Sequence, residues 1–242
     1  MDVTVPLDKP PIDPHIELTV PARNCSFFIL CKIALLAAIR GAFYFLNQQK
    51  EFLSGSTVNS TRATGDAIQE ILADNFQSII GDDICRNYSS DFARRAMADL
   101  AFEDGDNCYH VVDVKTHRLD TRFNMPNLIS VERLARFYED DRNYFVILMI
   151  AYNVSGLRAV IEEVRFVPIE FLGWDCLTIG ALGWGQIQIT NSNVVSINPQ
   201  YSRKQWMLEL CDTLLEFYPK EIAKIDRRIE HFRTIRAKWE VR

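Results

Sequence analysis

Apolar residues recur at helical spacing in one segment of the N-terminal half. Residues 66–81 read DAIQEILADNFQSIIG, and the apolar positions recur three or four apart: Ile68, Ile71, Leu72, Phe76, Ile79 and Ile80. Gly81 suits the end of a helix, because glycine readily adopts the left-handed backbone conformation found there. The pattern predicts an amphipathic helix over residues 66–81, preceded by a polar loop over residues 52–65.

The middle of the chain has the shorter apolar runs that are typical of strands. Two such runs flank DGDN, residues 104–107, which is a strong turn signal and predicts a β-hairpin. Residues 143–169 predict two more strands joined at residues 153–156, and residues 180–191 predict a glycine-broken turn that enters another strand. Residues 128–140 predict a short helix between these strands.

The two ends of the chain complete the predicted architecture. Four prolines predict an extended N-terminal arm over residues 1–25, and residues 202–242 predict C-terminal helices, two of them, broken at Pro219. Strands in the middle with helices before and after favour one α/β domain over residues 1–242, built on a central mixed β-sheet flanked by α-helices.

The apolar segment 26–46 is long enough to span a bilayer. It carries Lys32 and Arg40 in its interior, and each charge costs about 2.5–3.5 kcal/mol at the centre of a membrane helix. The segment therefore predicts a core helix with two charges at its edge, and no membrane partner.

Net charge and cysteine spacing argue against two classes of protein, nonspecific polycations and zinc-binding proteins. The 242 residues carry a formal net charge of −5, which argues against a nonspecific polycation but leaves room for a local basic surface. Residues 220–242 supply such a surface, with eight basic and four acidic side chains. The six cysteines form no CxxC pair, which indicates reduced thiols and no zinc site.

The segment HVVDVKTHRL, residues 110–119, has candidate chemistry. Side chains alternate along a strand, so Asp113 and Lys115 share one face while Val112 and Val114 share the other. Asp99 begins the partner strand of the hairpin, fourteen positions before Asp113, within reach across the turn. Two carboxylates and a lysine are then expected at one end of the sheet.

These residues suit a metal-dependent phosphodiester site. Mg²⁺ prefers oxygen ligands, which Asp99, Asp113 and the Val114 carbonyl can provide, and Lys115 can orient a water and offset charge. A structural ion pair between Asp113 and Lys115 explains the same spacing, so both interpretations remain open at this point. In the preceding predicted helix, Glu70 is a possible accessory acid, sharing a helical face with Asp66.

Four segments, in order, resemble a known family: ADLAF, VVDVKT, MPNLISVERLARFY and GWGQIQI. Together they resemble type II restriction endonucleases of the HincII and HpaI kind, which are PD-(D/E)XK nucleases with an EcoRV-like arrangement. The resemblance covers roughly three quarters of the chain and implies a restriction-endonuclease-like fold. It implies that Asp99, Asp113 and Lys115 are catalytic and that Mg²⁺ is the cofactor. The family's helix glutamate falls here on Glu70 or on Gln69.

The same resemblance implies two DNA-reading segments. Asn124, Asn127 and Ser130 belong to the first of them, and Gly183 and Trp184 to the second. An asparagine pairs with both N6 and N7 of adenine, which gives Asn127 a reason to contact a base. The same residue also suits the N-cap of the helix that follows.

The resemblance implies a homodimeric, Mg²⁺-dependent endonuclease of a prokaryotic cytoplasm. It would cut double-stranded DNA at a short palindrome, about six base pairs, with blunt ends, and a cognate DNA methyltransferase would protect the same site. Two alternatives stand beside it: a DNA-binding protein of the same fold without hydrolysis, and a nonspecific repair or recombination nuclease.

Overall fold

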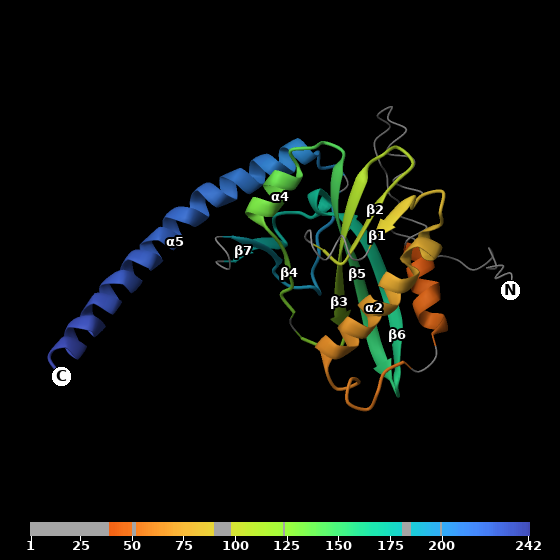
Figure 1. Cartoon of the computed structure of the whole chain (residues 1–242), viewed down its shortest axis with the longest axis horizontal. Coiled ribbons are helices and arrows are strands. Elements are labelled where there is room, and N and C mark those ends of the chain that lie inside the picture. The colour runs from red at the N-terminus through yellow and green to blue at the C-terminus, as the bar shows by residue number, and fades with distance from the viewer. Residues whose placement is uncertain (1–38, 50–51, 90–97, 123, 181–184, 199) are drawn as a thin grey trace.

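The computed structural model describes residues 39–49, 52–89, 98–122, 124–180, 185–198 and 200–242 (Figure 1). The expected N-terminal arm, residues 1–25, lies outside the described residues, as does most of the apolar segment 26–46. Within that segment, residues 39–48 are helical as predicted, and Ala42 and Leu46 are buried.

The architecture is mixed α/β, as the sequence predicts, with the strands divided between two sheets. The larger sheet has the order β1-β2-β3-β5-β6. Its strands are β1 (Asn87–Ser89), β2 (Leu100–Glu103), β3 (Tyr109–Arg118), β5 (Asn143–Ser155) and β6 (Arg158–Pro168). β3 and β5 pair in parallel at its centre, whereas all other neighbours are antiparallel, so the sheet is mixed.

A smaller antiparallel sheet has the order β4-β8-β7. Its strands are β4 (Asn127–Ser130), β7 (Leu177–Gly180) and β8 (Gln186–Ile189), and the 3-10 helix η1 (Ile169–Phe171) connects β6 to this part of the chain. The expected helix over residues 128–140 is wrong at its start, because the chain first pairs with β8. Helix α4 (Val131–Phe137) follows, and the Ser130 hydroxyl caps it by accepting from the Arg133 amide.

The alternation predicted for β3 is confirmed, because its two faces belong to two different cores. Val112 and Val114 pack in the core beneath helix α2 (Thr61–Ile80), which lies across one face of the larger sheet (Figure 1). Val111, one position away, packs in the second core with α4, the smaller sheet and the start of α5. Asp113 and Lys115 therefore belong to the face that looks toward the smaller sheet.

Helix α2 begins five residues earlier than predicted. The Ser60 hydroxyl accepts from the Ala63 amide, so a serine cap starts the helix inside the segment whose polarity predicted a loop. The predicted end is confirmed, because Gly81 has φ of 97° and its amide donates to the Gln77 carbonyl. The extra turn brings the N-terminal end of α2 next to β3.

The C-terminal segment is one helix, α5 (Arg203–Glu240), so the predicted break at Pro219 is wrong. Proline removes one backbone hydrogen bond and crowds the preceding turn. The residues around Pro219 are exposed or half-buried, so the freed carbonyl can bond to water while the remaining turns hold the helix on both sides. Only Trp206 and Leu210 of this helix are buried, and the rest extends away from the sheets (Figure 1).

Among the described residues, no helix combines the length and hydropathy that crossing a bilayer requires.

Asp104 organises the β2–β3 hairpin turn. One of its carboxylate oxygens accepts from the Asp106 and Cys108 amides, and the other bonds to the His110 ring at 2.9 Å. Although burial alone would raise the pKa of Asp104, the bond from His110 and these backbone bonds lower it below its ordinary value.

Asp104→Asn is expected to lower the free energy of unfolding by about 2 kcal/mol at neutral pH, since charge-assisted hydrogen bonds are lost. A carboxyl whose pKa is lowered on folding stabilises the fold above its unfolded pKa, near 4. The difference between the two proteins should therefore shrink as the pH falls through the lowered folded-state pKa of Asp104. Urea unfolding at a series of pH values measures this; a pH-independent difference would contradict it.

Candidate functional site

The candidate site lies where β2 ends and β3 continues. The Asp99 amide donates to the Val112 carbonyl, and the Asp99 carboxylate accepts from the Val114 amide at 2.7 Å. β2 begins at Leu100, so Asp99 lies directly before the strand, in the place of one more residue paired with β3. Strand geometry directs the amide and carbonyl of one residue to the same edge. The Val114 carbonyl therefore faces the open space beside Asp99.

Asp113 and Lys115 extend from the same face of β3, as the sequence predicted. The Lys115 ammonium donates to one Asp113 carboxylate oxygen at 2.7 Å. The structural ion pair that the sequence also allowed between Asp113 and Lys115 is therefore present. It engages only one oxygen, however, and among the described residues the other, Oδ2, is buried without a hydrogen-bond partner.

Asp113 is buried, with 5% of its surface exposed. Burial raises the pKa of Asp113 to about 7; Lys115 opposes this rise, and the neighbouring Asp99 charge adds to it. A buried carboxyl with an unpartnered oxygen beside a second carboxylate is a costly arrangement for stability alone. Such an arrangement is typical of functional sites, where a bound cation or substrate supplies the missing partner.

A groove of about 420 Å³ opens beside these residues. It lies between the N-terminal end of α2 and the C-terminal half of β3, and Lys115 and Val114 line it. Gly65 permits the approach of the two elements, because a Cβ there would lie 2.5 Å from the Thr116 hydroxyl. Asp99 and Asp113 do not line this groove themselves; Val114, whose amide bonds to Asp99, and Lys115, which bonds to Asp113, connect it to the carboxylate pair.

The acidic residues of α2 lie differently from the expectation. Gln69 lines the groove, whereas Glu70 is exposed and is not among its lining residues. Asp66 also lines the groove and lies 4.0 Å from the Arg62 guanidinium. The expected accessory position on α2 is therefore occupied by an amide, and the nearest helix carboxylate to the groove is one turn earlier.

The first expected DNA-reading segment lies at the edge of this groove. Asn124 lines the groove and also a smaller crevice on its far side. Asn127 is exposed on β4 and its side-chain oxygen accepts from the Gln188 amide of β8 at 2.5 Å. The N-cap of α4 is Ser130, so the capping interpretation of Asn127 is wrong. Of the second segment, Gly183 and Trp184 lie outside the described residues.

A loop that the sequence did not single out connects these parts. The Ser192 amide and hydroxyl both donate to the Asn124 carbonyl at 2.9 Å. The Asn193 side-chain amide donates to the Arg122 carbonyl at 3.2 Å, and its oxygen bonds to the ring of His117 at 2.7 Å. His117 lies two positions after Lys115 on the same strand face, so the loop links the Asn124 segment to β3. Only a turn-forming NSN motif hints at this role in the sequence.

An ion pair on β6 was also missed. In the sheet register, Lys115 lies opposite Met149, which lies opposite Arg165. Arg165 donates to Glu163 at 2.5 Å, and both line the smaller crevice with Lys115 and Asn124. The alternation of Glu163 and Arg165 along the strand gives no signal for such a position, because the position depends on the pairing of three strands.

The donor set fits a hard divalent cation. Asp99, Asp113 and the Val114 carbonyl offer oxygen atoms at one open edge, and the unpartnered Asp113 oxygen is aimed at no protein donor among the described residues. Within that part of the chain, no three His, Cys, Asp or Glu side chains cluster closely enough to hold a metal ion together. Mg²⁺ retains several waters and commonly takes one or two carboxylates plus phosphate oxygens, which matches this small set.

A scan against models of known protein families finds no match for this chain, and a search of curated proteins finds none either.

Proposed function

We propose that the protein is a Mg²⁺-dependent endonuclease of the PD-(D/E)XK type that cleaves double-stranded DNA at a short palindromic site. The observation that carries the proposal is the meeting of Asp99, Asp113 and Lys115 at the open end of the β2–β3 pair, beside a groove. The order of the four sequence segments that resemble restriction endonucleases of the HincII and HpaI kind supports the same assignment.

The arrangement suits phosphodiester hydrolysis. Asp99, Asp113 and the Val114 carbonyl would hold Mg²⁺, which when bound supplies positive charge for a phosphate oxygen and lowers the pKa of water. Lys115, no longer held by Asp113 alone, would donate to the attacking water or to the phosphate. The water oxygen forms a bond to phosphorus, the bond to one sugar oxygen breaks, and that oxygen takes up a proton.

DNA contacts are proposed along the groove rim. Asn124, together with Asp66 and Gln69 of α2, lines the groove, and the exposed Asn127 follows three positions after Asn124 at the start of β4. Asn127 would exchange its bond to Gln188 for an adenine edge. A palindromic duplex has two-fold symmetry, so two copies of the chain would read its two halves.

Incubation of the purified chain with a mixed-sequence plasmid and Mg²⁺ tests the proposal. The expected result is a set of discrete fragments whose ends share one short palindrome when sequenced, with no cutting in the presence of a chelator. A smear of fragments with unrelated ends would instead favour a nonspecific repair or recombination nuclease. The absence of cutting in every metal tested would contradict the nuclease assignment.

One observation favours a second candidate, a DNA-binding protein of the same fold without hydrolysis. The Lys115–Asp113 ion pair satisfies the lysine without a metal. In that case the plasmid stays intact and DNA still shifts in a gel, and Mg²⁺ leaves the shift unchanged. The hydrolytic function predicts that Mg²⁺ is needed for cutting, so the two candidates give opposite results in the same experiment.

A further inference from the structure

Over most of helix α5, the described part of the chain leaves large apolar side chains exposed. Trp206 and Leu210 are its only buried residues, and Met207, Leu214 and Phe217 pack partly against the same core. The rest of the helix extends away from the sheets (Figure 1). Along the helix, eight large apolar side chains are exposed, with Leu215 at 74% and Phe232 at 64%. They are Leu208, Leu215, Tyr218, Ile222, Ile225, Ile229, Phe232 and Trp239. A row of this length on one helix is typical of an interface.

The spacing of this row identifies the kind of partner. Steps of three and four residues alternate from one end to the other, with the sites filled by Leu208, Cys211, Leu215, Tyr218, Ile222, Ile225, Ile229, Phe232, Arg236 and Trp239. This is a heptad repeat sustained for more than four heptads, with only Arg236 charged. Such a narrow repeat of 3.5 residues matches a second helix wound in a left-handed coiled coil. We call these ten residues the α5 seam.

We propose that the α5 seam pairs with the α5 seam of a second copy of this chain, with the two helices antiparallel. Each heptad contributes two residues to the seam, such as Ile222 in its first position and Ile225 in its fourth. In an antiparallel pair, the first-position residues of one helix face the fourth-position residues of the other. Ile222 then meets the partner's Ile225 at the centre, Leu215 meets the partner's Phe232, and Leu208 meets the partner's Trp239. Arg236 falls opposite the exposed Cys211 of the partner subunit near the ends, where water reaches it.

The charges beside the seam decide the direction. In the antiparallel pair, Glu221 lies beside the partner's Arg228, and Asp212 lies beside the partner's Arg233. Both pairs occur twice by symmetry, and both join opposite charges. In a parallel pair, Glu221 would lie beside the partner's Asp226 and Arg228 beside the partner's Arg233, so like charges would meet.

Apolar residues beside the seam agree with the same direction. Leu214, which packs partly against the core of its own chain, and Ile235 occupy equivalent flanking positions, and they meet each other only when the helices are antiparallel. Within one helix, Glu221 is bonded to Lys224 and Arg233 to Glu230. Arg233 and Glu230 are both largely exposed and such a pair is weak, so Arg233 remains available to a partner helix. The Glu221 side chain is 17% exposed, beside Lys224 at 58%.

The first test compares two variants of the full chain by sedimentation equilibrium without DNA. Ile222→Lys with Ile229→Lys puts two charges in the seam, whereas Ala223→Lys with Ala237→Lys puts the same charges on the exposed opposite side of the helix. We expect the wild type to have the mass of at least two chains. The seam variant should halve that mass and the control should keep it.

The second test determines the direction. Glu221→Arg alone should weaken association about tenfold, because each introduced arginine faces the partner's Arg228. Arg228→Glu alone should do the same, and the double variant should recover wild-type association. A parallel pair would give the opposite sign, since each single change would then place opposite charges together.

The outcomes separate this proposal from the nuclease proposal. A monomeric wild type would overturn the pairing of two α5 helices, and this is the result expected if the apolar residues 26–38 of the same chain cover the seam. Equal masses for the seam variant and its control would overturn it as well. These measurements use neither DNA nor Mg²⁺, so a failure of cleavage leaves them unaffected. Circular dichroism of each variant shows whether α5 remains helical.

Discussion

Asp113→Ala is expected to reduce cleavage of plasmid DNA about a thousandfold or more in Mg²⁺, while DNA binding stays within a few-fold of the wild type. Asp113 supplies the carboxylate whose Oδ2 atom is buried without a partner among the described residues. It also holds Lys115 at 2.7 Å. Its loss therefore removes a proposed metal ligand and releases the lysine at the same time.

Asp106→Ala is the matched control. This aspartate lies at the other end of the same hairpin and is exposed, so the net charge changes equally without touching the site. Asp113→Asn distinguishes charge from shape, because it keeps the volume of the side chain and removes its charge. It should be as inactive as Asp113→Ala, yet at least as stable as the wild type, since burial already penalises the charged form of Asp113. Cleavage near the wild-type rate in either Asp113 variant would sink the site assignment.

Local patterns predicted the part of the site that depends on one hairpin. The DGDN turn fixed the pairing of β2 with β3, and strand alternation put Asp113 and Lys115 on one face. Those two facts suffice to bring Asp99 beside Val114, because few residues separate the strands. The closeness of the two carboxylates and the lysine could be predicted because it arises from the geometry of one hairpin.

The parts that the sequence could not predict depend on distant segments or on competition between local preferences. The bond between His117 and Asn193 joins residues 76 positions apart, and no local pattern announces it. Asn127 suits a helix cap by type, but pairing with β8 makes it a strand residue and leaves the cap to Ser130. Pro219 disfavours a helix locally, yet α5 continues through it.

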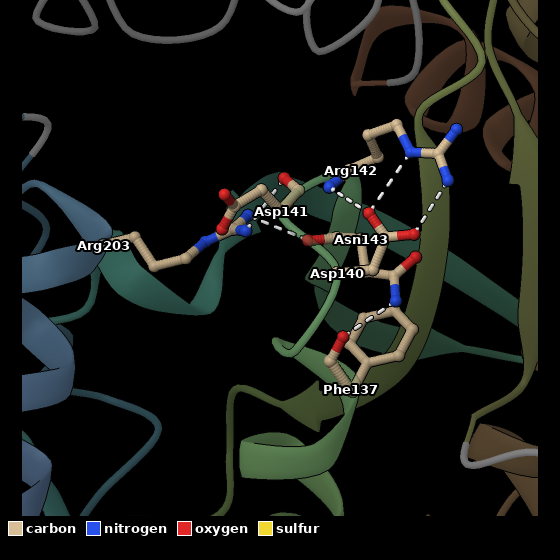
Figure 2. A network of polar contacts seen from close by, with 6 residues as sticks. All are labelled: Phe137, Asp140, Asp141, Arg142, Asn143 and Arg203. Carbon is tan, nitrogen blue, oxygen red and sulfur yellow. Dashed lines mark hydrogen bonds and ion pairs between the residues drawn. The ribbon is translucent and has the colours of Figure 1, made fainter.

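Arg203 joins the start of α5 to the sheets through several polar contacts, and Arg203→Met is the second large prediction. Arg203 donates to the Glu170 carboxylate at 3.2 Å and to two backbone carbonyls, of Asp141 at 3.1 Å and Asn143 at 2.8 Å. Figure 2 shows the guanidinium reaching from α5 to these two carbonyls. The group also stacks on the Tyr138 ring, 4.2 Å from its centroid.

Glu170 makes this contact costly to lose. The carboxylate is 5% exposed, and its other oxygen accepts from the Tyr138 hydroxyl at 2.8 Å. Burial, together with the neighbouring Glu170 charge, raises the pKa of Tyr138 well above its ordinary value, so the hydroxyl stays a donor. Without Arg203, Glu170 becomes a buried charge with one neutral partner. Breaking such a pair costs about 3–5 kcal/mol of unfolding free energy.

Arg142→Met is the control for this prediction, because Arg142 lies in the same network and pairs with Asp140 through a side-chain contact of 2.9 Å (Figure 2). Both partners are exposed to solvent, so the loss of this pair should cost much less stability than the loss of Arg203. A second comparison isolates the charge on Glu170: in a Glu170→Gln background, Arg203→Met should cost clearly less than in the wild type. Urea unfolding of the wild type and of these four variants measures the losses. Equal losses for Arg203→Met and Arg142→Met would show that α5 is held by the packing of Trp206 and Leu210 instead.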